Sequence, residues 1–97
     1  MFEITFTESA LKDLEFHRKF DQVQVFDAVP EQLAHEPETE THHRKRLRET
    51  DVPQWELRVG LFRVFYNVAG EERRVDVVAV AKKEHNKLYI RGEEAKL

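Results

Sequence analysis

The sequence predicts a small α+β domain with the element order β-α-α-β-β-β, in which two N-terminal helices pack on one face of a small antiparallel sheet. Three observations lead to this prediction. An alternating segment opens the chain, two stretches of helical periodicity follow, and strand-like apolar segments fill the second half. With 97 residues and 40% hydrophobic residues, the chain has the size and composition of a single globular domain covering residues 1–97.

The first strand and helix are predicted from apolar spacing. Phe2, Ile4 and Phe6 alternate with polar residues, which is typical of a half-buried strand. Thr7 is a suitable N-cap for a helix that we expect to run to about Lys19. This helix would bury the apolar residues that recur at helical spacing after Thr7.

A second helix is predicted from a stripe of four apolar residues at helical spacing, Val23, Phe26, Val29 and Leu33. Pro30 lies inside this pattern and removes a backbone donor. We therefore expect a kink, or two short helices that meet near Asp27–Val29. The polar segment from residue 35 to residue 51 has no apolar period and is predicted to be a connecting loop.

A hairpin is the most informative feature of the second half. Gly60 and Leu61 fit a two-residue type II′ turn between the segments 55–59 and 62–66. In that register Trp55, Leu57, Val59, Phe62, Val64 and Tyr66 share one side, and Trp55 and Tyr66 are expected in the core. Glu56, Arg58, Arg63 and Phe65 point to the other side.

The same register places Arg58 directly across from Arg63. Like charges opposite each other destabilise a hairpin by a few tenths to about 1 kcal/mol, so the pair indicates a site for an anion. The alternative is that a carboxylate holds the pair, since Glu56 sits diagonally from Arg63.

The chain is predicted to end in a third strand of the set and a short last element. The third strand is predicted over residues 73–81, in which Val75 and the run from Val77 to Ala81 are apolar, as in a strand buried on both faces. Residues 82–86 are predicted to form a turn, and residues 88–90 a short strand or helical turn.

Composition narrows the classes of function. With no cysteine, disulfides, thiolate metal sites and a cysteine nucleophile are excluded. We expect no membrane span, no secretory signal and a cytoplasmic location. The net charge of −3 is unevenly distributed: residues 1–41 carry 10 acidic and 3 basic side chains, whereas residues 42–91 carry 12 basic and 7 acidic ones. The basic half contains the hairpin, which favours a polyanionic partner.

The second half of the chain also resembles a known family. The segments that carry the resemblance are 55–60 (WELRVG), 62–68 (FRVFYNV), 77–83 (VVAVAKK) and 86–94 (NKLYIRGEE). In this order and at these spacings they are similar to the RelE/ParE superfamily of toxins from bacterial type II toxin–antitoxin modules, and to its RelE-like branch. The helical half fits the same branch, so the resemblance covers nearly the whole chain.

The resemblance implies an endoribonuclease that cleaves messenger RNA, usually on the ribosome, without a metal or other cofactor. The 2′-hydroxyl of the RNA attacks the phosphodiester, and the partner that inhibits the enzyme is a cognate antitoxin. Two alternatives remain open. One is a ParE-like toxin that poisons DNA gyrase and has no nuclease activity. The other is an inactivated family member that acts only as a binding partner or regulator.

The resemblance also implies roles for four residues, Arg58, Arg63, Lys83 and Tyr89, and the chemistry of Glu56 and His85 makes these two further catalytic candidates. Arg63 would bind the scissile phosphate with Arg58 beside it, and Lys83 takes the place of an arginine. Tyr89 would act near the substrate base, or else fill the core. Glu56 departs from the family pattern, because a basic residue is expected there; it could serve as a base, and His85 as an acid or base.

RNA contacts are predicted for a further set of residues, Arg44, Lys45, Arg46, Arg48, Phe65 and Lys82. The basic run would contact the phosphate backbone, although such a run is more often a solvated loop. Phe65 is a candidate for base stacking, with burial as its alternative. His42 and His43 lack the spacing of metal ligands, and no metal site is predicted.

Overall fold

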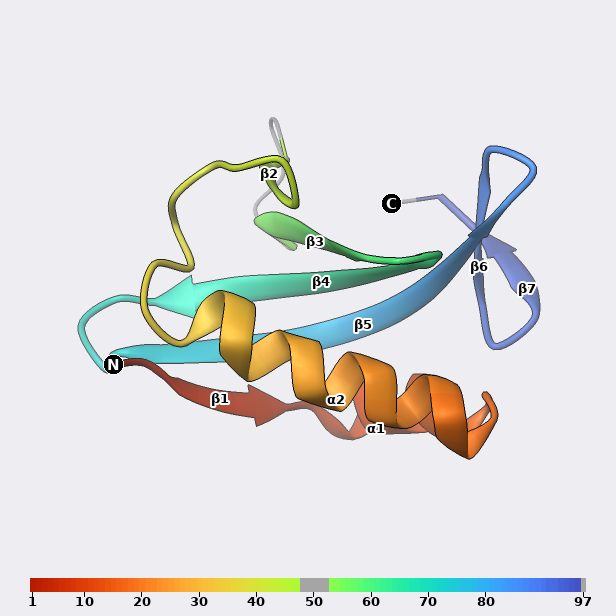
Figure 1. The fold of residues 1–97 in the computed structure, drawn as a ribbon, viewed down its shortest axis with the longest axis horizontal. Helices are drawn as coiled ribbons and strands as arrows, with labels where there is room; N and C mark the ends of the chain where they lie inside the picture. The colour runs from red at the N-terminus through yellow and green to blue at the C-terminus, as the bar shows by residue number, and fades with distance from the viewer. Residues whose placement is uncertain (48–52, 97) are drawn as a thin grey trace.

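In the computed structural model of the protein, residues 1–47 and 53–96 are described (Figure 1). Two helices and seven strands follow one another in the order β1 (Glu3–Phe6), α1 (Glu8–Glu15), α2 (Lys19–Leu33), β2 (Arg44–Arg46), β3 (Trp55–Val59), β4 (Phe62–Ala69), β5 (Arg74–Glu84), β6 (Lys87–Ile90) and β7 (Glu93–Ala95). Within the described part of the chain, neither helix has the length and apolar character needed to cross a bilayer.

One twisted sheet carries all the strands, in the order β2-β3-β4-β5-β6-β7, with β1 added beside β5 (Figure 1). The predicted α+β class is confirmed. The antiparallel arrangement holds for every pair but one, because β1 runs parallel to β5. The first half of β5 therefore pairs with β1 and its last residues pair with β6.

Helix α1 begins where its sequence predicts and ends earlier. The Thr7 side chain accepts a hydrogen bond from the Ala10 N–H at 3.1 Å and caps the helix as expected. The helix stops at Glu15 and not near Lys19, because Lys19 already belongs to the next helix.

Helix α2 is continuous, so the expected division into two short helices is wrong. Pro30 lies in its last turn, where a missing N–H removes a single intrahelical hydrogen bond. The Pro30 carbonyl still accepts the N–H of Ala34, which closes the helix.

The core lies between the helices and one face of the sheet. Buried residues of both helices and of β3, β4 and β5 form one cluster, which includes Trp55 and Tyr66 as predicted. The stripe predicted for α2 is partly wrong: Val25, Val29 and Leu33 are buried, whereas Val23 and Phe26 are exposed. The buried set repeats every four residues, and the Phe26 ring instead packs on Phe6 at the edge of the layer, with ring centroids 5.0 Å apart.

The end of the chain is more regular than predicted. Strand β5 continues to Glu84, so residues 82–84, predicted as part of a turn, belong to the strand. The turn consists of His85 and Asn86, both with positive φ as a type I′ turn requires. Residues 88–90 lie in β6 as one of the two predicted options, and β7 follows as an additional strand.

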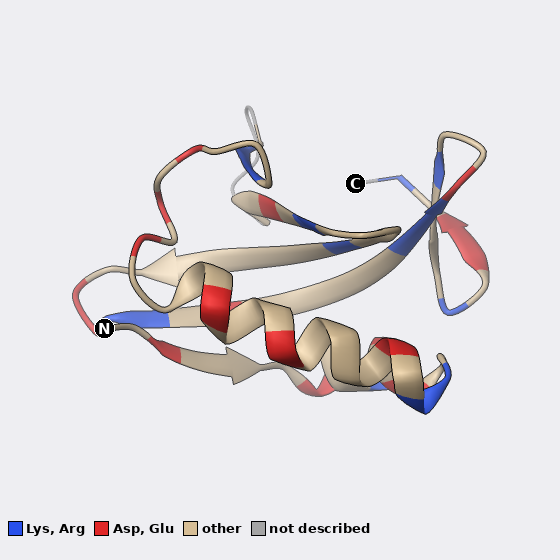
Figure 2. Ribbon diagram, in the orientation of Figure 1, with Lys and Arg blue, Asp and Glu red and all other residues tan. Residues whose placement is uncertain are grey.

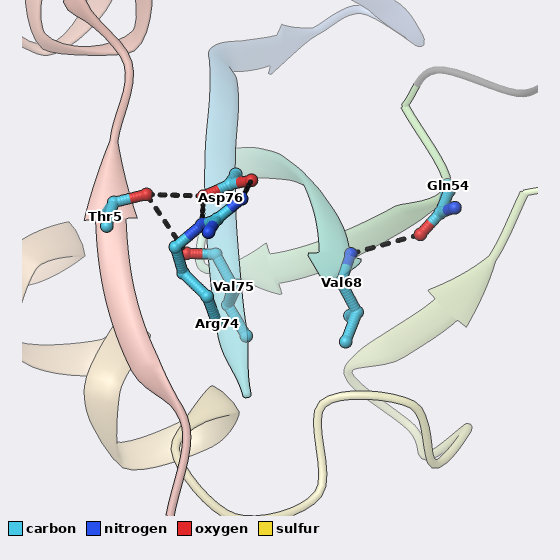
Figure 3. A network of polar contacts seen from close by, with 6 residues as sticks. All are labelled: Thr5, Gln54, Val68, Arg74, Val75 and Asp76. Atoms are coloured by element: carbon cyan, nitrogen blue, oxygen red, sulfur yellow. Dashed lines mark hydrogen bonds and ion pairs between the residues drawn. The ribbon is translucent and has the colours of Figure 1, made fainter. Parts of the chain in front are cut away.

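Polar side-chain contacts join β1 to β5, and the residue before β3 to β4 (Figure 3). The Thr5 hydroxyl donates to Asp76 Oδ1 at 2.6 Å, and Arg74 approaches the same carboxylate with Nε at 2.7 Å and Nη2 at 3.1 Å. Arg74 and Thr5 together lower the pKa of Asp76. On the other side of the sheet's centre, Gln54 Oε1 accepts the Val68 N–H at 3.1 Å.

The long connection between α2 and β3 contains β2, a short strand in a segment predicted to be loop. β2 pairs antiparallel with β3 and forms the edge of the sheet. The chain before it is tied to the core, because the Tyr66 hydroxyl donates to the carbonyl of Pro37 at 2.7 Å. Arg48, predicted to contact RNA, lies outside the described residues.

Candidate functional site

The β3–β4 hairpin has the predicted register. All five pairs occur, from Trp55 opposite Tyr66 to Val59 opposite Phe62, and Arg58 faces Arg63. Gly60 has a φ of +56°, whereas Leu61 is not among the described residues with positive φ. A positive φ at the first turn residue only is the pattern of a type II′ turn. Two arginines therefore lie side by side on the face of the sheet opposite the helices.

The two arginines differ sharply in exposure and in partners. Arg58 is exposed, whereas Arg63 is only 6% exposed. Arg63 Nη1 donates to the carbonyls of Gly60 and Phe62, at 2.9 Å each. Arg63 Nε lies 3.4 Å from Glu56 Oε2, the diagonal contact expected if a carboxylate holds the pair.

Electrostatics at Arg63 reflect this environment. Burial, and secondly the positive charge of Arg58, lower the pKa of the Arg63 guanidinium, and Glu56 acts in the opposite direction. A cation that is removed from water beside another cation requires a compensating negative charge. Glu56 supplies that charge in this structure.

Further side chains join the arginines on the same side of the sheet. Lys45 on β2 lies across from Glu56, and its side chain is exposed. Lys83 follows Ala81, the partner of Arg63, by two residues, and its N–H donates to the Leu61 carbonyl at 2.7 Å. We call this surface the hairpin face; it consists of Lys45, Glu56, Arg58, Arg63, Phe65 and Lys83.

Basic and acidic residues are unevenly distributed over the molecule (Figure 2). Basic residues mark the adjoining ends of β3, β4 and β5, and acidic residues mark α2. Within the hairpin face itself there are four basic side chains and one carboxylate, Glu56.

The six residues for which catalytic roles were expected do not gather at one place. Tyr89 pairs with Lys82, which itself pairs with Phe62, a residue of the helix-covered core. By register Tyr89 and Lys82 therefore lie on the opposite side of the sheet from Arg63. His85 is exposed at the β5–β6 turn.

The predicted RNA-contacting residues also divide. Arg44 Nη1 donates to the carbonyl of Gln32 at the end of α2. The Arg46 guanidinium lies over the Trp55 ring, 5.8 Å from its centroid. These contacts direct both arginines to the helix side. Among the described residues of the basic run, Arg44 to Arg46, only Lys45 lies on the hairpin face.

Phe65 requires a correction. Its side chain is 1% exposed, and a ring so deeply buried is not accessible for stacking on a base. The alternative expected for Phe65, that its ring is buried, is therefore the correct one.

Sequence reasoning missed a buried carboxylate that joins three parts of the fold. Asp13 on α1 is 1% exposed. Its Oδ2 accepts the Val80 N–H at 3.0 Å, in the part of β5 between its pairings with β1 and β6. Its Oδ1 lies 2.9 Å from Arg91 Nε in the turn between β6 and β7. The signal in the sequence is that Asp13 shares the apolar side of α1 with Ala10 and Leu14.

Comparison with known proteins agrees with the fold. The family model described as ParE toxin of type II toxin-antitoxin system, parDE, matches residues 4–86. Among curated proteins, no sequence matches the chain.

The solved structures that are similar to this chain include the following three. The toxin–antitoxin complex RelBE2 of Mycobacterium tuberculosis matches with a TM-score of 0.73 and 23% identity, over 84% of this chain and 98% of that chain. The isolated Escherichia coli RelE toxin matches with a TM-score of 0.71 and 23% identity, over 88% of this chain and 87% of that one. A YoeB/ParE toxin from Agrobacterium tumefaciens matches with a TM-score of 0.65 and 20% identity, over 84% and 99%. At these identities the likeness concerns the fold.

Proposed function

Because the chain belongs to the ParE toxin family of type II toxin–antitoxin systems, in the RelE/ParE superfamily, we propose that it is a ribonuclease toxin that cleaves messenger RNA on the ribosome. In this proposal the 2′-hydroxyl of the RNA attacks the adjacent phosphodiester, and the hairpin face binds the reacting phosphate. The proposed target implies a cytoplasmic location.

One observation supports the proposal most strongly: the charge of the hairpin face. Three accessible basic side chains, those of Lys45, Arg58 and Lys83, lie on it beside the nearly buried Arg63, which is paired with the single carboxylate, Glu56. RNA carries one negative charge per nucleotide, and phosphate contacts by lysine and arginine supply most of the affinity of such complexes. A surface of this charge, kept free of helices, suits an extended strand of RNA.

In the step, the bond from phosphorus to the 5′-oxygen of the next nucleotide breaks as the 2′-oxygen attacks, the departing 5′-oxygen takes a proton from water, and a 2′,3′-cyclic phosphate is left. Arg58 is exposed and would make the first contact with the scissile phosphate, and Lys83 lies on the same face and would share the charge of the transition state. Glu56 would be the base that removes the 2′-hydroxyl proton. The Arg63 side chain is almost fully buried, so it would add positive charge below the phosphate while the exposed Arg58 makes the first contact. Tyr89 has no part in this scheme, because register places it on the other side of the sheet.

The test is primer extension on translated messenger in cells that express the chain. We expect cuts within codons for the wild-type protein and their loss in Arg58→Ala. Arg58 is the better choice than Arg63 because an exposed side chain can be removed without disturbing the fold. Arg18→Ala is the matched control, since Arg18 is an exposed arginine before α2, and its cleavage pattern should equal that of the wild type.

A second candidate is a gyrase-poisoning toxin without nuclease activity. The observation in its favour is the contact of Arg63 with Glu56, together with the separation of Tyr89 from the arginines. Such a toxin needs a binding surface but no catalytic group. Intact messenger combined with trapped gyrase–DNA cleavage complexes would establish this candidate and exclude the first.

A cognate antitoxin is proposed as the natural partner. The similar Mycobacterium tuberculosis structure is a toxin–antitoxin complex, and a similar archaeal fold from Pyrococcus horikoshii was solved as a RelE-RelB complex. An antitoxin could inhibit by laying acidic residues across the hairpin face, or by adding a strand at the edge formed by β2. Co-expression with the neighbouring reading frame should restore growth. If the antitoxin covers the hairpin face, Arg58→Ala should lower the affinity of the antitoxin for this protein.

A further inference from the structure

We infer that Glu56 is an internal competitor for the anion that the hairpin face binds. In this inference the Glu56 carboxylate occupies the Arg63 guanidinium until a phosphate group displaces it, so Glu56 weakens anion binding by the resting protein. The inference rests on the proposed function, because it concerns how the same face is regulated.

The geometry around Arg63 makes the guanidinium a fixed receptor and Glu56 its removable occupant. Arg63 Nη1 is held by two backbone carbonyls at 2.9 Å, and its side chain is 8% exposed. Glu56 approaches Nε at 3.4 Å from a side chain that is 22% exposed. The more exposed partner can rotate towards solvent, whereas the buried one cannot follow it.

The chemistry of the contact explains why a phosphate would compete for it. A carboxylate and a phosphate both present two oxygens that match the donors of a guanidinium. Arg63 is deprived of water by burial and faces the charge of Arg58, so it needs an anion of one kind or the other. Glu56 satisfies this need in the absence of RNA.

The surrounding residues favour the exchange once RNA is present. Glu56 has Lys45 across from it on β2, so the displaced carboxylate finds another cation beside it. Arg58 is exposed next to Arg63 and attracts the phosphate to the position where the exchange occurs. Glu56 thereby lowers the affinity of the hairpin face for RNA without preventing RNA from binding.

The experiment measures the affinity of the purified protein for a short RNA in which every 2′-hydroxyl is methylated. Such an RNA cannot be cleaved by 2′-hydroxyl attack, so binding is separated from catalysis. Glu56→Gln keeps the shape of the side chain and removes its charge; we expect binding about tenfold tighter than that of the wild type. Glu31→Gln is the matched control, because it changes the net charge equally at an exposed position of α2 and should alter the affinity less than about twofold.

A double-mutant cycle and one spectroscopic measurement complete the test. In an Arg63→Lys background the gain from Glu56→Gln should shrink to about the size of the control effect. In the unsubstituted protein the NMR signal of the Arg63 Nε–H should move when the methylated RNA is added, even if a variant folds poorly.

Three results would overturn the inference: equal gains for Glu56→Gln and Glu31→Gln, a gain from Glu56→Gln that persists unchanged in the Arg63→Lys background, or an Arg63 signal that RNA leaves unmoved. If Glu56→Gln tightens binding but wild-type protein cleaves no messenger in cells, the inference stands and the proposed ribonuclease activity fails.

Discussion

Replacing Asp13 tests how the hairpin formed by β6 and β7 is attached to the rest of the molecule. Its buried carboxylate holds the Val80 N–H at 3.0 Å and Arg91 Nε at 2.9 Å, so that Asp13→Ala leaves one buried donor unsatisfied and one cation without its partner. An unsatisfied buried donor costs about 1–3 kcal/mol, and loss of one partner of a fully buried ion pair about 3–5 kcal/mol. Because the Arg91 side chain is 45% exposed and recovers water, we expect a total of about 3 kcal/mol.

The assay is urea denaturation of Asp13→Ala, Asp13→Asn and the control Glu15→Ala, an exposed residue of the same helix. Asp13→Asn retains an oxygen for the Val80 N–H and loses only the charge, so its free energy of unfolding should fall by about half as much as that of Asp13→Ala. Glu15→Ala should change it by less than about 0.5 kcal/mol. An Asp13→Ala variant within about 1 kcal/mol of wild type would refute the reasoning, because the carboxylate would then hold neither partner.

Three further predictions concern the core and the turns. His17 packs edge-on to the Phe62 ring, and burial, followed by the charge of Lys82, lowers the pKa of His17 in the folded protein. Because the unfolded state binds more protons as pH falls through about 6.5, the free energy of unfolding should decrease over that range. His17→Gln should make the free energy of unfolding less dependent on pH in the same range. Phe20→Ser, at a side chain that is 74% exposed, should change the unfolding free energy by less than about 0.5 kcal/mol, whereas Val29→Ala should lower it by about 2 kcal/mol; equal effects in urea denaturation would contradict the assignment of the two sides of α2. Gly60→Ala should lower it by about 1–2 kcal/mol, because Gly60 has a φ of +56° and a Cβ there would lie 3.2 Å from Gln24 Nε2; a neutral effect would argue against the type II′ turn.

The parts of the fold that could be predicted are those in which local sequence determines the geometry. The β3–β4 register follows from alternation and from one glycine in the turn, and every predicted pair occurs. The Thr7 cap is similarly local. The parallel pairing of β1 with β5 could not be predicted in this way, because it joins segments at opposite ends of the chain and depends on packing of the whole layer.

The errors in the sequence prediction have physical causes. The spacing of α2 permits two overlapping stripes, and which one is buried depends on how the helix lies on the sheet; the structure selects the stripe with Val25. Strand β2 consists of Arg44, Lys45 and Arg46, which have no strand propensity, and it forms because β3 offers an unpaired edge. Propensity alone cannot reveal an edge strand of this kind.

The candidate site was predicted in part for the same reasons. Alternation places Arg58 and Arg63 together, so this pair follows from the sequence. The burial of Arg63 and of Phe65 depends on tertiary packing, which alternation does not describe. The sequence leaves the Glu56 contact as one of two alternatives, because which anion meets Arg63 depends on how the side chains pack.

The most direct test of the central claim is to map RNA ends that carry a 2′,3′-cyclic phosphate in cells that express the protein. Attack by the 2′-hydroxyl leaves this group, so its presence reports the proposed chemistry. We predict new cyclic-phosphate ends inside coding regions for the wild-type and Arg18→Ala proteins, and their loss in Arg58→Ala. Growth arrest by the wild-type protein without such ends above background would contradict the account.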